Sequence, residues 1–301
     1  PDGRLYVAER FGDIRAYNIT RNGSNDYQVE SSETITSIHD IPNYNDDGTY
    51  AGSVQGPSYL APDGNNRQVT GIIVEGNATN PEIYVSSSDP RVGAGEEGAD
   101  TGLDTNSGTI SRITKTDSGW DHVMLVRGLP RSEENHATNG LQYDRVSNTL
   151  YVAQGGHTNK GARSKNFANL SEYALSAAIL SIDLDEVNSM QEKNAANTGV
   201  PYLYDLPTRR PNLTSSDRPF GGMDGRNMAV WTRSTPVDVY SPGYRNAYDI
   251  AFNDAGQLYA TDNGGNPGWG GVVVGEGPQG KCTNAYNEDD AESAPGVYHI
   301  D

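Results

Sequence analysis

The chain has 301 residues, of which 40 are acidic and 22 are basic, so its formal net charge is −18 at pH 7. This charge excludes nucleic acids and anionic membrane surfaces as favourable partners, because both would repel the protein. A single cysteine, Cys282, excludes an intramolecular disulfide, so packing or bound ions must stabilise the fold.

The same acidic, lysine-poor composition suits a protein that works in salty surroundings, where dissolved ions screen its self-repulsion. We therefore expect a secreted, periplasmic or cell-surface protein from a marine or halophilic source. No apolar run approaches the length that crosses a membrane, so we expect no membrane insertion.

Short segments in which apolar and polar residues alternate occur along the whole chain, separated by residues that favour turns. This period of two predicts β-strands. The stretch 129–184 shows the repeating unit best, because a polar loop there leads into three consecutive strands. In chain order, strands are predicted at residues 4–8, 13–17, 69–74, 82–86, 109–113, 121–126, 140–143, 149–153, 178–184, 236–240, 248–252, 257–261 and 296–300.

The second strand of this unit occurs four times, and each copy is followed by a third strand. Four-stranded antiparallel units at spacings of tens of residues predict an all-β fold, a β-propeller. A large Greek-key sandwich has the same strand pattern and stays open as an alternative. About four units are visible and neither end completes its own, so residues 1–301 are expected to form a single propeller domain, incomplete at both ends.

Two polar loops contain candidate ligands for calcium. Residues 43–48 alternate oxygen donors with a glycine, but they lack the spacing and the final glutamate of an EF-hand loop. In the loop 87–108, the side chains of Glu96, Glu97, Asp100 and Asp104 lie among glycines. Such carboxylates repel one another unless a cation or salt intervenes. A solvated loop is the alternative at both places.

His136 is the candidate catalytic residue. It lies on the loop before a first strand, which in a propeller opens toward the axial face, and Asn135 and Asn139 flank it. A neutral imidazole there is suited to act as a general base on a hydroxyl group. His157, on the next loop of the same unit, is expected to face the same opening. The alternative is a structural or surface histidine.

Arg245 also stands just before a first strand, so the repeat places it on the same face as His136. An arginine can bind a carboxylate with two parallel hydrogen bonds, although a structural role is equally open. After the next strand, Asp262 and Asn263 precede Gly264 and Gly265. These residues offer carboxylate, amide and backbone oxygens to a hard cation. Trp269 follows, and it either stacks on a ligand or covers a sheet.

Five short pieces occur in the order typical of the glucose/sorbosone dehydrogenase family, which the chain resembles over roughly residues 1–269. They are Leu129-Pro130 to His136, Asn139-Gly140-Leu141, Leu150-Tyr151-Val152, Gly243-Tyr244-Arg245-Asn246 and Asp262-Asn263-Gly264-Gly265.

The resemblance implies a six-bladed propeller that oxidises a sugar or related alcohol with pyrroloquinoline quinone (PQQ) and calcium. It implies His136 as the base that takes the hydroxyl proton. Arg245, with Asn246 and Asn139, would contact the quinone. The backbone of Gly264 and Gly265, with Asp262, would bind calcium.

The chain departs from the family at several positions. Gly155 and Gly156 stand where an aspartate usually supports the histidine, and the usual upstream Gln or Glu falls near Asn66. The insertion 158–177 is long, and the lysine and arginines that clamp the quinone would lie beyond residue 301.

A non-catalytic propeller that binds carbohydrate or protein, as part of a large secreted or adhesive protein, is therefore the alternative to the dehydrogenase. A calcium-dependent hydrolase of lactones or phosphoesters is a third possibility. The expected partner in the first two cases is a small sugar or a glycan.

Overall fold

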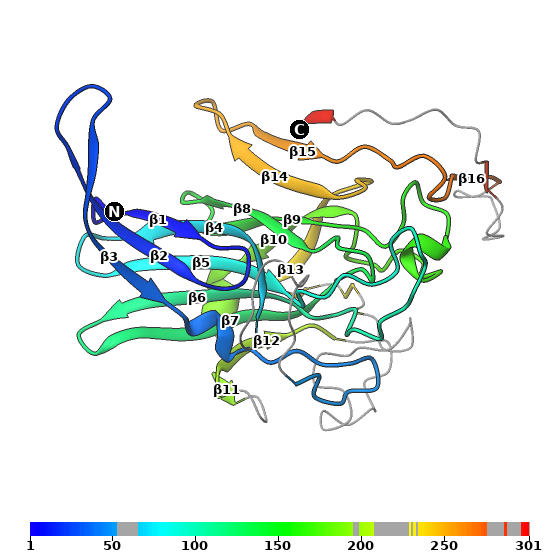
Figure 1. The fold of residues 1–301 in the computed structure, drawn as a ribbon, viewed down its shortest axis with the longest axis horizontal. Coiled ribbons are helices and arrows are strands. Elements are labelled where there is room, and N and C mark those ends of the chain that lie inside the picture. Colours follow the sequence, from blue (N-terminus) through cyan, green and yellow to red (C-terminus); the bar gives the residue numbers. More distant parts are fainter. Residues whose placement is uncertain are drawn as a thin grey trace.

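The computed structural model describes residues 1–52, 66–194, 199–207, 229, 231–232, 234–275, 286–287 and 296–300. Within these ranges the chain is almost entirely β-structure (Figure 1). The strands are β1 (Leu5–Ala8), β2 (Ile14–Arg21), β3 (Tyr27–Ile35), β4 (Gln68–Gly76), β5 (Pro81–Ser88), β6 (Gly108–Thr116), β7 (Gly119–Leu129), β8 (Thr138–Asp144), β9 (Thr149–Gln154), β10 (Ala178–Asp183), β11 (Lys193–Asn194), β12 (Pro201–Asp205), β13 (Val237–Pro242), β14 (Ala247–Phe252), β15 (Leu258–Asp262), β16 (Val272–Val273), β17 (Tyr286–Asn287) and β18 (Gly296–Ile300).

Four antiparallel meanders follow one another along the chain. Their strand orders are β1-β2-β3, β4-β5-β6-β7, β8-β9-β10-β13 and β14-β15-β18. In the second meander, β12 adds to β7 in the parallel direction and β11 pairs with β12. Every strand predicted from the alternation is present, including the two fourth strands, β7 and β13. The all-β prediction is confirmed.

The packing between the meanders is that of a propeller. The inner strands β4, β8 and β14 lie side by side, and hydrogen bonds join them: Thr70 Oγ1 donates to Thr138 O at 2.6 Å, and Asn139 Nδ2 donates to Ala247 O at 2.8 Å. Each pair of neighbouring sheets encloses its own apolar core. A sandwich would instead have one core between two sheets. The propeller is therefore the architecture, and the sandwich is excluded.

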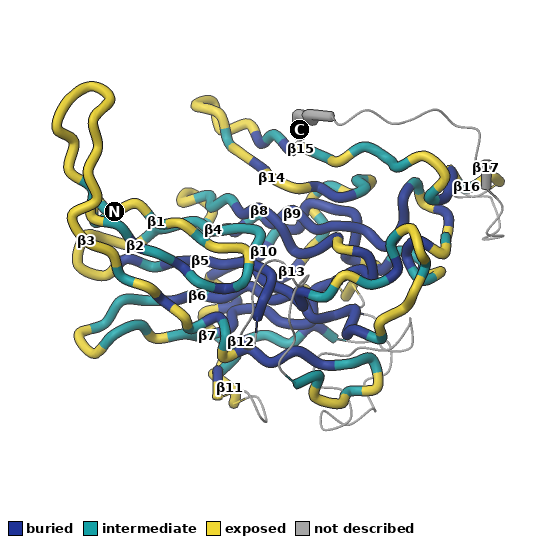
Figure 2. The backbone as a smooth tube through the Cα atoms, in the orientation of Figure 1, coloured by how far each residue is buried: buried dark blue, intermediate teal, exposed yellow. Residues whose placement is uncertain are grey.

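The three cores differ in size. The largest lies between the second and third sheets and includes Ile110, Val126 and Val152. Ile14 and Val85 belong to the core between the first and second sheets, and a smaller core lies between the third and fourth. Figure 2 shows this buried interior along β5 to β10, whereas the β2 to β3 hairpin is exposed.

Several elements were not predicted: the strands β3, β11, β12, β16 and β17, and the helix α1 (Leu184–Asn188). No strand was predicted over β3, yet it pairs with β2 over its length. Most of its residues are exposed on both faces, so no apolar alternation marks it in the sequence. The strands β11 and β12 follow the short helix α1. That helix begins where strand was expected at Leu184, because the carboxylate of Asp183 caps it by accepting the Glu186 N–H at 2.9 Å.

No helix in the described part of the chain has the length and apolar character to span a membrane.

Candidate functional site

Four loops meet at one end of the sheets, on the right in Figure 1. Two of the loops lead into β8 and β14, and the other two follow β9 and β15. The predicted site residues lie in these loops, except Asn139 and Asp262, which lie at the adjoining ends of β8 and β15. Backbone hydrogen bonds connect them: Gly156 N donates to Arg245 O at 2.9 Å, and Gly155 N donates to Ala137 O at 2.8 Å. The structure thus brings His136 and Arg245 to the same face.

The ring of His136 is held in a defined orientation. Its Nδ1 lies 2.9 Å from the carbonyl oxygen of Gly156. Because a carbonyl only accepts hydrogen bonds, Nδ1 carries the proton and Nε2 keeps its lone pair. Burial lowers the pKa of His136 well below its usual value, and the positive charge of Arg245 lowers it further. His136 is therefore a neutral base at neutral pH.

The two glycines explain the missing aspartate. A Cβ atom added to Gly156 would lie 2.9 Å from Arg245 O and 2.9 Å from the Cβ of Ala177, closer than side chains normally approach. No aspartate fits there. The backbone instead comes close enough for the Gly156 carbonyl to orient the histidine, which is the task that the carboxylate performs in the family that the chain resembles.

Two further side chains complete the surroundings of His136, and neither was predicted. Glu134 Oε2 lies 3.7 Å from Nε2 of His136. Burial raises the pKa of Glu134, and the positive charges of Arg131 and Arg245 oppose that rise. Phe167, from the insertion 158–177, packs against the imidazole with ring centres 5.1 Å apart. Glu134 was in principle recognisable, because it stands two residues before His136.

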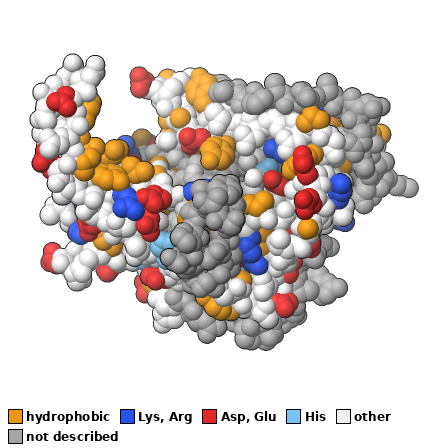
Figure 3. Space-filling model, viewed as in Figure 1, with side chains coloured by type: hydrophobic (Ala, Val, Ile, Leu, Met, Phe, Trp, Pro, Cys, Tyr) orange, Lys and Arg blue, Asp and Glu red, His pale blue; other side chains and the backbone are white. Residues whose placement is uncertain are grey.

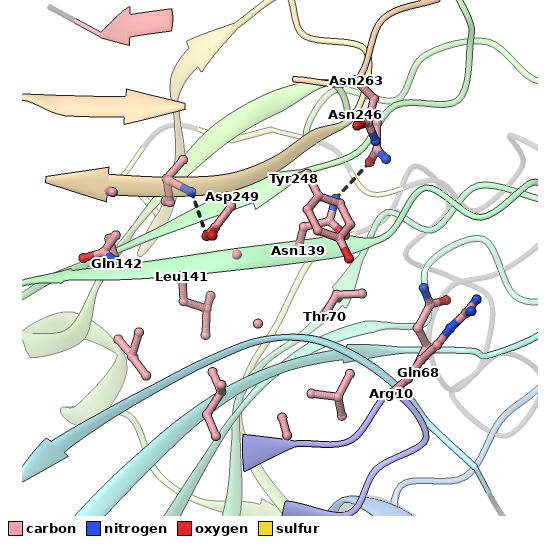
Figure 4. A pocket seen from close by; sticks show the side chains of 18 of the residues that line it. Arg10, Gln68, Thr70, Asn139, Leu141, Gln142, Asn246, Tyr248, Asp249 and Asn263 are labelled. Carbon is pink, nitrogen blue, oxygen red and sulfur yellow. Dashed lines mark hydrogen bonds between the residues drawn. The ribbon is translucent and has the colours of Figure 1, made fainter. Parts of the chain in front are cut away.

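Asn139 and Asn246 bind each other rather than pointing into open space. Asn139 Nδ2 donates to Asn246 Oδ1 at 2.9 Å, and this bond is drawn in Figure 4. Both side chains are buried at the wall of a groove of about 750 Å³ along β4, β8 and β14. Other polar side chains in that wall are Arg10, Gln68, Tyr248, Asp249 and Asn263.

Arg245 and Asp262 line a second groove, of about 610 Å³, together with Gly264, Gly265 and Lys160. Four of the seven predicted site residues therefore share this groove. Arg245 Nε donates to Asn159 Oδ1 at 2.9 Å. Both carboxylate oxygens of Asp262 accept backbone N–H groups, from Arg245 at 2.9 Å and from Asn246 at 2.7 Å. Asp262 thus shapes the turn before β14.

The structure also places three other residues that the sequence singled out, namely Asn66, His157 and Trp269. Asn66 is absent from both groove walls, whereas Gln68, two residues later, lines the first groove and its Oε1 has no hydrogen-bond partner among the described residues. His157 is fully buried, stacked on Tyr173 with ring centres 4.0 Å apart, so it does not face the opening. Trp269 meets Phe167 edge to face, with ring centres 6.1 Å apart.

Comparison with known proteins identifies no family for the chain. No protein-family model matches it, and no curated protein matches it. Among solved structures, the PQQ-bound aldose sugar dehydrogenase of Streptomyces coelicolor is similar at 16% identity with a TM-score of 0.44, covering 98% of this chain and 66% of that one. A Thermus thermophilus protein named as a glucose dehydrogenase has 15% identity and a TM-score of 0.42, covering 91% of this chain and 57% of that one.

A Trichoderma reesei enzyme of carbohydrate-active family AA12 is similar at 15% identity with a TM-score of 0.35, covering 88% of this chain and 71% of that one. The chain thus spans less than two thirds of the two bacterial structures. Similarity at this level carries no conclusion about activity.

Proposed function

We propose that the chain is the site-bearing part of a quinone-dependent oxidoreductase that oxidises a hydroxyl group of a sugar or related alcohol, with His136 as the base. The observation that carries the proposal is the bond from His136 Nδ1 to the Gly156 carbonyl, which leaves Nε2 free to accept a proton. The motif order supports the substrate class and the cofactor.

The second groove has the chemistry that PQQ and calcium require. Arg245 and Lys160 provide positive charge for the carboxylates of the quinone. The backbone of Gly264 and Gly265, beside Asp262, provides oxygen atoms for calcium. When bound, the quinone would accept the electron pair that leaves the alcohol carbon.

The chain's own residues then handle the proton and the orientation. His136 Nε2 accepts the hydroxyl proton, and the Gly156 carbonyl keeps the ring turned for this task. Glu134, 3.7 Å from Nε2, stabilises the positive charge that the ring gains and opposes the repulsion from Arg245. The first groove, with the side chains of Gln68 and Asn263 in its wall, offers amide groups to sugar hydroxyls.

The proposal is tested by titrating the full-length protein with PQQ and calcium while following the absorbance of the cofactor, and then by measuring dye reduction with a panel of aldoses. We expect saturable binding and sugar-dependent reduction. His136→Asn places its amide nitrogen near the position of Nδ1, so it keeps a donor for the Gly156 carbonyl but removes the base, and the rate should fall about 10²- to 10⁴-fold while quinone binding persists. His39→Gln, which changes a histidine that pairs with Asp13 and lines neither groove, is the control and should keep the rate.

A binding module without catalysis is the second candidate, and one observation favours it. His136 is only 2% exposed and is absent from the walls of both grooves. Sugar binding in calorimetry, with no quinone binding at high micromolar concentration, would establish this reading and overturn the dehydrogenase.

A further inference from the structure

Three carboxylates from separate loops meet away from the grooves described above. Asp46 lies in the turn after residues Ser37–Asp40, Asp100 in the loop between β5 and β6, and Glu133 in the loop that leads to His136. One carboxylate oxygen of each lies within 4.8 Å of those of the other two. Backbone bonds hold the loops together: Asp46 N donates to Gly102 O at 2.8 Å, and Gly93 N donates to Glu133 O at 2.7 Å.

Glu133 gives an independent sign that a ligand belongs there. Its side chain is 0% exposed. Oε2 accepts from Thr101 N at 3.2 Å and from Thr101 Oγ1 at 3.1 Å, whereas Oε1 is buried and has no hydrogen-bond partner in the described part of the chain. Leaving a buried carboxylate oxygen unpaired is costly, so a missing partner is implied.

No positively charged side chain in the described ranges fills this role. Arg91 and Arg131 are electrostatically coupled to Glu133, but they bind elsewhere. Arg91 donates to Asp89, to Asn45 and to the carbonyl of Tyr44, and Arg131 donates to the carbonyls of residues 89, 91 and 132. The charge of Asp100 adds to the effect of burial and helps to raise the pKa of Glu133 to about 7. The described part of the chain therefore supplies no cation to Glu133.

We propose that Asp46, Asp100 and Glu133 bind one calcium ion. Calcium takes six to eight oxygen ligands at about 2.3–2.6 Å, so oxygens on opposite sides of the ion are separated by roughly 5 Å, which accommodates the spacing found here. Magnesium demands near-ideal octahedral geometry, keeps several waters and is usually held by one or two carboxylates, so a site of three protein carboxylates favours calcium. Neither of the polar loops 43–48 and 87–108 forms the site alone. Asp46 comes from the first loop and Asp100 from the second, and both lie beside Glu133.

The ion has a structural consequence for the catalytic loop. Glu133 is adjacent to Glu134 and three residues before His136, so calcium ties this loop to the loops that follow β3 and β5. The inference is independent of the proposed dehydrogenase activity, and it applies equally to a binding module.

The test is calorimetric titration of calcium into the EDTA-treated full-length protein without quinone, together with thermal unfolding with and without calcium. We expect a site that raises the unfolding midpoint by about 5 °C at saturating calcium and responds at least tenfold more weakly to magnesium. Glu133→Gln and Asp100→Asn should each weaken calcium binding at least tenfold. Glu96→Gln, an exposed residue of the same loop, is the matched control and should bind like the wild type.

Asp100 is exposed, so Asp100→Asn keeps the test valid if Glu133→Gln fails to fold. Calcium bound beside Gly264 and Gly265 would not depend on Asp100 or Glu133, so a calcium response that Asp100→Asn and Glu133→Gln both leave unchanged would belong to that other position and would also overturn the proposal. Absence of a calcium-dependent shift at 5 mM (about the upper end of protein affinities), or equal weakening by Glu96→Gln, would overturn the proposal.

Discussion

At the scale of single residues, the candidate site depends on backbone atoms where side chains were expected. The Gly156 carbonyl orients His136, the Gly156 N–H binds the Arg245 carbonyl, and Asp262 holds the turn before β14 through backbone N–H groups. Glycine at position 156 is what permits this approach, because a side chain there would meet three atoms at 2.9 Å. His136 is therefore held in a defined orientation without the expected aspartate.

His157 shows the cost of burying an imidazole without partners. Neither ring nitrogen has a hydrogen-bond partner among the described residues, and burial lowers its pKa to about 3. The neutral form is favoured in the folded state, so its stabilisation is complete above pH 6.5 and is lost as the pH falls from 6.5 toward 3.

We therefore expect His157→Phe, which keeps the stacking on Tyr173, to be more stable than the wild type at pH 5 by about 2 kcal/mol. At pH 8 the two proteins should differ much less. Urea unfolding at both pH values measures this. Equal differences at pH 5 and pH 8 would show that the protonation of His157 does not limit acid stability.

At the scale of elements, the inner strands β4, β8 and β14 pack closely because glycines lie where neighbouring strands touch. Gly71 on β4 faces the carbonyl of Asn139 on β8, and Gly140 on β8 faces the backbone of β14. A Cβ atom on Gly140 would lie 2.9 Å from the Cα of Asp249 and 3.0 Å from Tyr248 O. These glycines set the distance between neighbouring sheets and so the position of the loops at their ends.

Gly140→Ala is therefore expected to destabilise the fold by about 1–3 kcal/mol, because backbone atoms of β14 must move apart. Gly140 does not have a positive φ, so the effect is steric. Gly23→Ala, in the exposed β2 to β3 turn, is the control, since its nearest contact would be 3.8 Å away. Urea unfolding measures both, and an equal effect of the two changes would contradict close packing of the inner strands.

At the scale of the whole molecule, charge repulsion dominates the surface. Acidic side chains are spread over the visible face in Figure 3, with fewer basic ones between them. Exposed ion pairs such as that of Arg145 with Glu75, at 2.8 Å, contribute little and are also screened by salt. Because the net charge is −18, salt should weaken the repulsion among acidic side chains more than it weakens the attraction within ion pairs.

The unfolding midpoint should consequently rise by a few degrees between roughly 0.02 and 0.5 M sodium chloride, where the Debye length falls several-fold. Choline chloride at equal ionic strength should have the same effect if screening is the cause. A rise with sodium alone would point to a bound cation, and a falling midpoint would show that attractive pairs dominate.

Much of the fold follows from local pattern, and much of the site does not. The alternation of apolar and polar residues in strands such as β9 and β15 shows that one face of each strand is buried. The recurrence of that pattern along the chain predicts a series of packed sheets. β3 has no buried face along most of its length, so only its pairing with β2 reveals it. The motif around His136 singled out that histidine, but it did not predict that His157 is buried or that Phe167 packs on His136.

The sequence by itself determined most of the strands, their order and the residues with reactive side chains, because each of these depends on neighbours along the chain. The tertiary structure alone decided which loops meet. It brought Glu133 next to Asp100 and next to Asp46, which is much farther away in sequence. It also placed the Gly156 carbonyl, rather than a carboxylate, beside His136. Such contacts depend on the distance between sheets, which is set by packing between residues far apart in sequence.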